Sequence, residues 1–445
     1  MNRLRLSIIL KTTVLFLVLL SIMIVPSAVG AGLTITEVRN RAVEYNRTYL
    51  SAKEDVALAQ SEIVRTRADA LPNLHFSAGY TRTLEIPSQF VEFGGVTQEL
   101  RLGLDNSFNY GLTLEQPIWH GGKVFTAYSI AREYKKYAEK GSEAVKASVI
   151  ETAEILFYSV ALEKARLQVF NRAYEANSRN FEMVEMKYSK GLVSRYEYLR
   201  AQVERDNLLP LIIKAESDVK LAEKKLKSFI GIDLNEEISI VEEIDDTSLV
   251  NLPALPELTN RALEDRPEMT RAEHLTAISK KAIRVAKGGF LPDFDAFMAY
   301  GWSAQSNDFT LDENTSRSWT AGVTVNLPIF NGGRTFGDVS QRQAQYRQSQ
   351  LAERQTRDDI RLEVEAAYDA LLQAKKSLDI QGLTIAQAEE GLKIANLRYE
   401  SGVGTQLEVL SAQAALTDAR SALAEALFMF RQAKAGLKKA TTLDI

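Results

Sequence analysis

The chain has 445 residues, 45% of them hydrophobic and 25% charged, a composition typical of an ordered protein rather than a disordered one. Its 54 Lys and Arg residues against 58 Asp and Glu residues give a formal net charge of −4, which offers no basic surface for nucleic acid. The absence of cysteine excludes disulfides, thiolate metal sites and a lipidated N-terminal cysteine.

The first thirty residues are typical of a secretory signal peptide. Arg3, Arg5 and Lys11 precede an almost wholly apolar run at 14–25, and the small residues of SAVGA follow it. The apolar run is shorter than the roughly 20 residues that a membrane-spanning helix needs. We therefore expect residues 1–30 to be a cleaved signal peptide and the mature chain to be exported.

A first repeat is expected over 31–230, and it opens on an amphipathic helix. Apolar residues recur at helical spacing from Ile35 to Ile63. The period then drops to two, which predicts strands at about 73–83 and about 107–116. Each strand has about ten residues, the length of a tilted transmembrane β-strand, although a soluble sheet with one buried face gives the same alternation.

The second strand leads into a junction, EQPIWHGGKV at 115–124. Pro117 cannot donate to a strand ladder, so we expect it to end the strand. Trp119 suits a membrane–water boundary. Gly121 and Gly122 allow the backbone to turn sharply into a helix.

A long coiled-coil helix is predicted at about 121–189, because apolar spacings of four and three alternate over nearly six heptads. A return helix is predicted at about 194–229, and Pro210 is expected to kink it. Residues 231–262 separate this first repeat from a second one.

The second repeat, expected over 263–445, spells the same unit again. After an opening helix it has two strands, a long helix and a return helix, at about 292–302, 318–327, 332–400 and 405–438. The junction phrase recurs as NLPIFNGGRT, 211 residues after the first. The chain is therefore an internal duplication of a whole supersecondary unit.

The second junction places Pro328, Gly332 and Gly333 where the first has its proline and glycine pair, and so predicts the same passage from strand to helix. Beyond the signal peptide no apolar run approaches spanning length, so a membrane-embedded form must be a closed β-barrel. Four strands cannot close around a pore, so several chains must pool their strands. Two chains would give eight strands, three would give twelve and four would give sixteen.

The order of these features resembles that of the outer-membrane efflux protein family, the TolC-like channels. Both junctions read P-I-x-x-G-G-[KR], and ALEDRPEM at 262–269 is similar to an R-P-E phrase of the family. The resemblance covers essentially all of the mature chain. It implies an α+β membrane protein that is a homotrimer. Its 12-stranded outer-membrane β-barrel, four strands per chain, continues as a 12-helix periplasmic α-barrel of coiled-coil helices, with an equatorial segment at 231–262.

The function that the resemblance implies is passive conduction from the periplasm of a Gram-negative bacterium across its outer membrane. A periplasmic adaptor and an inner-membrane efflux or ABC transporter would deliver drugs, toxins or proteins to this exit duct, in tripartite efflux or type I secretion. We expect no cofactor and no enzymatic activity. The phrase GGKVFT, for example, lacks the leading glycine and the hydroxyl of a phosphate-binding loop.

The helix-hairpin tips would form the periplasmic end of the duct. Gly191 and Gly402 follow the long helices at the distance expected of a left-handed C-terminal cap. The resemblance implies that the adaptor contacts the tip loops, namely Gly191, Leu192, Val193, Gly402, Val403 and Gly404.

An aperture is expected just beyond the tips. Glu197 and Glu408 occupy equivalent positions 211 residues apart, and the resemblance implies that acidic residues there constrict the periplasmic mouth. A trimer would hold six such carboxylates, which would favour cations over anions. The alternative for each residue is a solvated glutamate on a helix face.

The sequence departs from the family pattern around this aperture. Ser411 stands where relatives often have a second acid, and Gly404 stands in place of an arginine that bridges neighbouring helix pairs. Arg195 is a candidate to replace that arginine. Tyr188 and Tyr399 are candidates for the same closed-state network.

Two alternative functions compete with the duct: a periplasmic adaptor, and a coiled-coil scaffold protein without a pore. An adaptor needs one helical hairpin and a compact β domain rather than two hairpins with four amphipathic strands. A scaffold has no use for the strands. Both alternatives therefore explain less of the sequence than the duct does.

Overall fold

The computed structural model describes residues 32–101, 103–241, 252–311 and 314–443. The signal peptide expected at 1–30 lies outside these residues. Among the described helices, none combines the length and the apolar character that a membrane span needs. The chain divides into two compact units, and three helices contribute to both.

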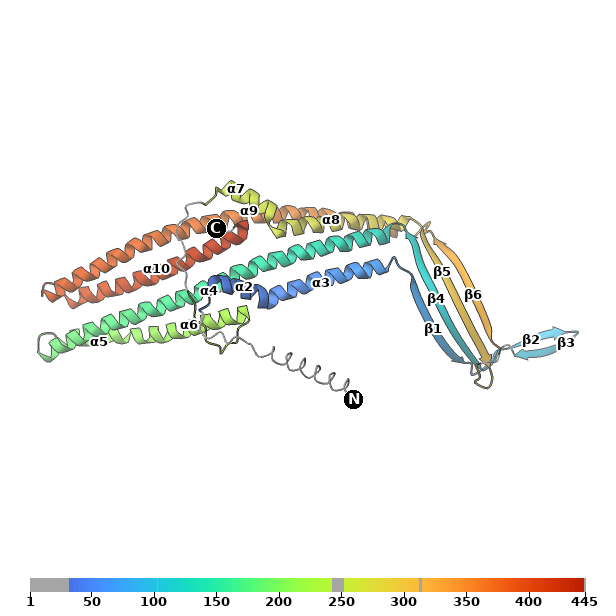
Figure 1. The fold of residues 1–445 in the computed structure, drawn as a ribbon, viewed down its shortest axis with the longest axis horizontal. Coiled ribbons are helices and arrows are strands. Elements are labelled where there is room, and N and C mark those ends of the chain that lie inside the picture. The colour runs from blue at the N-terminus through green and yellow to red at the C-terminus, as the bar shows by residue number, and fades with distance from the viewer. Residues whose placement is uncertain (1–31, 102, 242–251, 312–313, 444–445) are drawn as a thin grey trace, which may run out of the picture. The chain divides into compact units, whose positions relative to one another are not determined.

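The first unit consists mainly of helices and holds the ends of two helical hairpins (Figure 1). It comprises the residues up to 45, 152–248 and 375–432. Its elements are α2 (Ile35–Tyr45), the later part of α4 (Lys123–Ser189), α5 (Arg195–Asp206), α6 (Leu208–Ile230), the later part of α9 (Arg334–Glu400) and most of α10 (Gln406–Thr441).

The second unit combines helices with the strands and comprises 46–151, 249–374 and 433–445. Its helices are α3 (Arg47–Ala68), α7 (Leu255–Asp265), α8 (Pro267–Lys287), the short 3-10 helix η1 (Gly288–Phe290) and the remaining parts of α4, α9 and α10. Its strands are β1 (Asn73–Arg82), β2 (Ser88–Phe93), β3 (Val96–Arg101), β4 (Asn106–His120), β5 (Asp293–Ser306) and β6 (Ser316–Asn326).

Two of the predicted helices are broken. Asn46 interrupts the helix expected from Ile35 to Ile63 and caps α3, its side-chain oxygen accepting hydrogen bonds from the amides of Thr48 and Tyr49 at 3.0 and 3.3 Å. The apolar stripe continues across this break, so helical periodicity alone did not reveal it.

The return helix after the first tip is likewise two helices, α5 and α6, with Asn207 between them. Pro210 explains this break, because its ring clashes with the carbonyl of Asp206 and it has no amide to donate to that carbonyl. The expected kink therefore lies just before Pro210.

The structure repeats its helices at fixed offsets. Adding 211 to the bounds of α4, and to the span from α5 to α6, gives the bounds of α9 and α10. Adding 220 to the bounds of α2 gives those of α7, Leu255–Asp265. The second copy therefore begins at Leu255 and not at 263, and α7 belongs to that copy rather than to the segment 231–262. The predicted start fell at the phrase ALEDRPEM (262–269), which spans the end of α7 and the start of α8.

The four-stranded sheet is antiparallel throughout, in the order β1-β4-β5-β6. Within the first copy Asn73 lies opposite Glu115, and within the second Asp293 lies opposite Asn326. The pair β4–β5 joins the two copies. Strands β1 and β6 form the two edges of the sheet.

The prediction that Pro117 ends its strand is wrong. Strand β4 continues to His120 and stays paired with β5, with a register shift between Pro117 and Trp119 that leaves Ile118 without a partner. A bulge of this kind tolerates proline, because the ladder is already interrupted there. In the second copy β6 does end before Pro328, at Asn326.

A second sheet, the hairpin β2–β3, lies between β1 and β4 along the chain, where no strand was predicted. Phe93 and Val96 close it across Gly94 and Gly95, whose φ angles are 60° and 80°. Two adjacent left-handed residues make the tight turn that matches the twist of antiparallel strands. The Gly-Gly pair between two short apolar runs was the available signal.

Each unit has an apolar core built from the predicted helix stripes. In the first unit Phe181, Val184 and Ala201 pack α4 against α5. In the second unit one cluster joins α7, α8, α9 and the end of α10; its buried members are Leu258, Ala262, Met269, Ile360, Val364 and Ala440.

Candidate functional site

Both hairpin tips, which belong to the first unit, begin with the same helix cap. At the first tip Gly191 has a φ of 70°, and Gly191 and Leu192 donate their amides to the carbonyls of Tyr188 and Lys187, each at 2.9 Å. These two hydrogen bonds together form a Schellman cap.

At the second tip Gly402 has a φ of 76°. Gly402 and Val403 donate to the carbonyls of Tyr399 and Arg398 at 3.2 and 3.0 Å. The duplication therefore preserves the turn in its hydrogen bonds as well as in its sequence.

Glu197 takes part in the cap of α5. Its carboxylate accepts the amide of Ser194 at 3.0 Å, while its own amide donates to the Ser194 hydroxyl at 3.2 Å. Such a capping box stabilises the start of a helix. Glu197 thus has a structural role within its own hairpin, whatever else its charge does.

Glu408 is paired with an arginine of its own tip. Its carboxylate accepts a hydrogen bond from Nε of Arg398, the two atoms lying 3.1 Å apart. Arg398 lies in the last turn of α9, and Arg195, the expected substitute for the missing arginine, is exposed at the other tip. Ser411 is also exposed, one turn further along α10.

Gly404 is required by the close approach of the chain at the second tip. Its amide donates to the Arg398 carbonyl at 2.8 Å, and a Cβ atom added to Gly404 would lie 2.8 Å from the Cβ of Arg398. An arginine at 404 would collide with Arg398. The second tip therefore has its cation before the turn, at Arg398, which is paired with Glu408.

The two tyrosines that were grouped in one network make different contacts. Tyr188 stacks on Tyr198, with ring centroids 5.0 Å apart. Tyr399 instead lies under the ammonium group of Lys187, 4.1 Å from the ring centroid, in a cation–π contact between α9 and α4. Sequence reasoning missed Lys187, although it is the residue equivalent to Arg398 in the first copy.

The strand-to-helix junctions use both glycine pairs in the left-handed conformation, with φ of 56° and 73° at Gly121 and Gly122, and 67° and 84° at Gly332 and Gly333. At Gly121 two segments of the chain also approach closely, since an added Cβ would lie 2.6 Å from the carbonyl oxygen of Gly288.

Two polar pairs hold the first junction to β5. Lys123 lies 2.8 Å from the carboxylate of Asp293, and Nε2 of His120 lies 2.7 Å from that of Asp295. These two aspartates therefore fix the end of β4 against β5.

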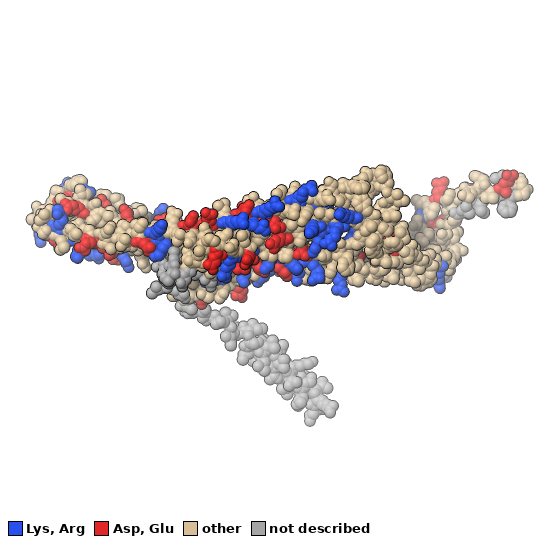
Figure 2. All heavy atoms as spheres, turned by 90° about the horizontal axis from the view of Figure 1, so that it is seen from above, with Lys and Arg blue, Asp and Glu red and all other residues tan. Residues whose placement is uncertain are grey.

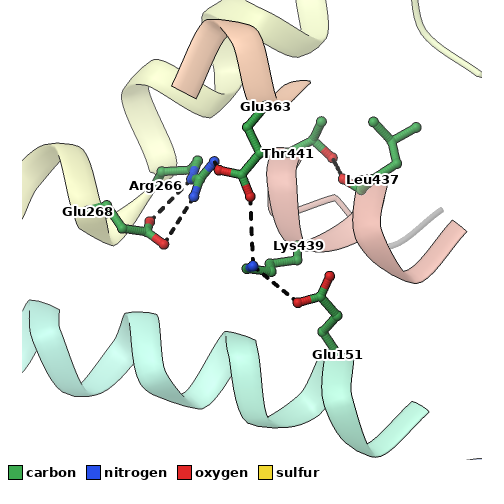
Figure 3. A network of polar contacts seen from close by, with 7 residues as sticks. All are labelled: Glu151, Arg266, Glu268, Glu363, Leu437, Lys439 and Thr441. Atoms are coloured by element: carbon green, nitrogen blue, oxygen red, sulfur yellow. Dashed lines mark hydrogen bonds and ion pairs between the residues drawn. The ribbon is translucent and has the colours of Figure 1, made fainter. Parts of the chain in front are cut away.

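The R-P-E phrase forms a polar network around the buried Arg266 in the second unit (Figure 3). The buried Arg266 guanidinium contacts both oxygens of Glu268 at 3.1 and 3.2 Å and reaches Glu363 on α9 at 2.6 Å. Lys439 on α10 lies 3.7 Å from Glu363 and 3.1 Å from Glu151 on α4. Four helices, α8, α9, α10 and α4, are thereby joined around one arginine.

The network also sets the ionisation of Glu268. Burial opposes the charged form of this carboxyl, but the hydrogen bonds and the positive charge of Arg266 outweigh it and hold the pKa of Glu268 below its ordinary value. Glu268 is therefore ionised at neutral pH, as the pairing requires.

Charge is distributed unevenly over the surface. Figure 2 shows Lys, Arg, Asp and Glu gathered over the helices on the face in view, while the four-stranded sheet is nearly bare of them. Exposed apolar side chains instead alternate along the edge strands, Leu74 and Phe76 on β1 and Val323 and Val325 on β6.

Comparison with known proteins gives consistent likenesses. The sequence matches the family described as "Outer membrane efflux protein" over residues 38–232 and 258–442. The outer membrane protein OprJ of Pseudomonas aeruginosa is 24% identical over 84% of this chain and 76% of its own length.

Solved structures share the fold. The crystal structure of a membrane protein from Pseudomonas aeruginosa superposes with a TM-score of 0.78 at 21% identity, covering 94% of this chain and 98% of that one. The outer membrane protein VceC of Vibrio cholerae gives a TM-score of 0.74 at 18% identity, over 92% of this chain and 95% of that one.

Proposed function

Because the chain belongs to the outer membrane efflux protein family, and so serves as an exit duct of the outer membrane, we propose that three copies assemble around one pore. Four strands per chain are too few to enclose a pore, and twelve strands suffice. The exposed apolar residues of β1 and β6 fit contact with lipid, since a membrane-embedded strand alternates apolar and polar side chains.

The periplasmic mouth of the duct is formed by the hairpin tips. Glu408 and Glu197 lie just beyond the two capped turns, so a trimer carries six carboxylates around this mouth. Each Glu408 is paired with Arg398, which balances its charge and limits its contribution to ion selectivity. Glu197 is tied to the cap of α5 and contributes a carboxylate held in place by that cap.

The observation that carries this proposal is the paired arrangement of the tips: two equivalent Schellman caps, each followed after a few residues by a glutamate with a defined partner. A solvated glutamate on a helix face would need neither the cap nor the partner. The cation–π contact of Lys187 with Tyr399 joins the two hairpins of one chain. Such a contact fits a closed mouth in which neighbouring helix pairs stabilise one another.

A periplasmic adaptor docks on the exposed tip loops. Leu192 and Val403, the residues that follow the capping glycines, are 70% and 71% exposed. Two apolar side chains at equivalent places on neighbouring tips form a small docking patch whose burial favours association. The adaptor then links the duct to an inner-membrane efflux or ABC transporter, which supplies the energy, and the duct conducts its cargo passively without a catalytic step.

Purified mature protein in detergent, followed by reconstitution in a planar lipid bilayer, tests the proposal. We expect a particle with the mass of three chains and discrete cation-preferring openings. A protein that stays soluble and monomeric without detergent and gives no conductance would instead fit an adaptor, and would contradict the duct.

A further inference from the structure

One large aromatic side chain, Phe297, lies on the polar face of the four-stranded sheet. Residues directly opposite one another in an antiparallel sheet share a face. The row through Phe297 consists of Asn73, Glu115, Phe297 and Gly322, one residue from each strand. The other paired residues of this face are polar or small, and among them Phe297 is the only Phe, Tyr or Trp that the structure describes. Its ring is exposed, so packing in a core does not account for it.

The duplication supplies an internal comparison for this position. Adding 220 to the number of Ser77 gives Phe297, and adding 211 to that of Gly111 gives Gly322. In the first copy Oγ of Ser77 would lie 3.1 Å from a Cβ atom added to Gly111. In the second copy the ring atoms Cε1 and Cζ of Phe297 would both lie 2.9 Å from a Cβ atom added to Gly322. The glycine therefore makes room for the ring, as glycine in a strand does where another group approaches closely.

The residue opposite the ring also departs from the repeat. Adding 211 to the number of Glu115 gives Asn326, so the first copy has a carboxylate where the second has an amide. Glu115 lies directly opposite Phe297, and the Cβ atoms of such a pair are about 4.5–5.5 Å apart. The exposed carboxylate of Glu115 makes no hydrogen bond or ion pair with any described residue. An aromatic ring and an uncompensated carboxylate are thus neighbours where the two copies join.

An open cavity of about 810 Å³ lies beside this pair, within the size range of small-molecule sites. Its polar lining includes the carboxylates of Glu115, Asp69 and Asp295, and no described Lys or Arg lines it. Asp295 is paired with His120, whereas the carboxylate of Asp69 makes no hydrogen bond or ion pair with any described residue. Apolar side chains also line the cavity: Ala68, Leu71, Pro117 and Val124.

We propose that this cavity is a binding subsite of the duct for organic cations with an apolar body, and that Phe297 and Glu115 recognise them. The proposal rests on the proposed function, because the polar face of the sheet lines a pore only when several chains close a barrel. A cation over the face of an aromatic ring is attracted by the ring quadrupole. The carboxylates of Glu115 and Asp69 compensate its charge, and the apolar lining contacts the rest of the molecule.

The combination of groups favours this class of ligand over others. Two uncompensated carboxylates repel an anion. A neutral apolar molecule gains nothing from Glu115 and Asp69. A hydrated metal ion makes little use of a ring and an apolar lining, since hard cations prefer several oxygen ligands. The ring and both carboxylates are exposed, so binding is weak enough for the ligand to leave again, as conduction requires.

Equilibrium dialysis of tetraphenylphosphonium against the trimer in detergent, with empty micelles as the blank, tests the subsite. Tetraphenylborate, which has the same shape and the opposite charge, is the control ligand. Wild type should bind tetraphenylphosphonium saturably. F297L and E115Q should each raise the dissociation constant about fivefold, while F297Y, which keeps an aromatic ring, should bind like wild type. F330L and E92Q, matched changes at an exposed phenylalanine and an exposed glutamate outside the cavity, should leave binding unchanged.

The mass of each variant in detergent shows whether it has assembled. Weaker binding in F297L that F297Y does not restore would contradict the role of the ring. Tetraphenylborate that binds as tightly, with the same dependence on Phe297, would overturn the preference for cations. No saturable binding of tetraphenylphosphonium to a trimer that conducts, or equal affinities in wild type, F297L and E115Q, would overturn the subsite and leave the duct intact. A wild-type protein that neither forms trimers nor conducts would defeat the proposed function itself, so the two failures are distinguishable.

Discussion

Gly231 and Thr442 end equivalent helices, α6 and α10, in the same left-handed conformation, with φ of 72° and 56°. The two residues are 211 positions apart. At Gly231 a Cβ atom would lie 2.6 Å from the Cβ of Tyr45, so only glycine fits. Thr442 adopts the same backbone turn with a β-branched side chain, which is strained at positive φ.

Replacing Thr442 with glycine should therefore stabilise the protein. Relief of the strain should raise the free energy of unfolding by about 1 kcal/mol. The greater conformational entropy that glycine gives to the unfolded chain offsets part of this gain. The free energy of unfolding in denaturant, followed by circular dichroism in detergent, measures it. The matched change G231A should destabilise, because it adds both strain and a collision. Loss of stability in T442G would show that the threonine side chain contributes more than its conformation costs.

Much of the fold could be predicted because the chain presents it twice. The alternation of β1, β4, β5 and β6 and the apolar stripes of α4 and α9 gave the element order from local periodicity. What the pattern could not reveal were events that leave periodicity intact. The breaks at Asn46 and Arg266 preserve the apolar stripe on both sides, and the bulge after Pro117 depends on a partner strand 175 or more residues away.

The positions of the candidate-site residues could be predicted from the sequence, but their contacts could not. The two capping glycines and both glutamates could be located from the repeat alone. The partners of those glutamates could not, since Arg398 reaches Glu408 only because the chain turns back on itself at Gly404. The contact of Lys187 with Tyr399 joins two hairpins, and no local pattern specifies it.

Arg266 should be a stability determinant of the second unit. R266Q removes a buried guanidinium from Glu268 and Glu363. We expect it to cost about 2–3 kcal/mol, since Glu268 loses its partner and Glu363 keeps only Lys439. R261Q, at an exposed arginine one turn earlier on α7, is the control and should change stability by less than about 0.5 kcal/mol. Equal effects of the two changes would contradict the role of the network.

The same network predicts a dependence on pH. The pKa of Glu268 is held below its ordinary value. The pairing of Glu268 with Arg266 therefore stabilises the protein fully above the unfolded-state pKa of about 4.3. This stabilisation is lost as the pH falls through the folded-state pKa. The gap in unfolding free energy between wild type and E268Q should therefore be constant above about pH 5 and close below about pH 4. A difference in unfolding free energy that widens on acidification would contradict this prediction.

Replacing Gly404 with the arginine of the family pattern should disrupt the second tip. G404R, like G404A, places a Cβ atom 2.8 Å from that of Arg398, so the second tip must open and the bond from Arg398 to Glu408 must weaken. Limited proteolysis should cut both variants faster at the tip than wild type. S411A, on an exposed neighbouring position, is the control. Unchanged cleavage in both glycine variants would mean that the turn has room.

The measurement that tests the account most directly is the reversal potential of single channels in a salt gradient, for wild type, E408Q and R398Q. If Glu408 lines the periplasmic mouth with Arg398 balancing it, the two substitutions must act in opposite directions. E408Q should lower the preference for cations, and R398Q should raise it, because it leaves the carboxylate uncompensated. Reversal potentials that stay at the wild-type value in both variants would contradict the account and move the constriction away from the tips.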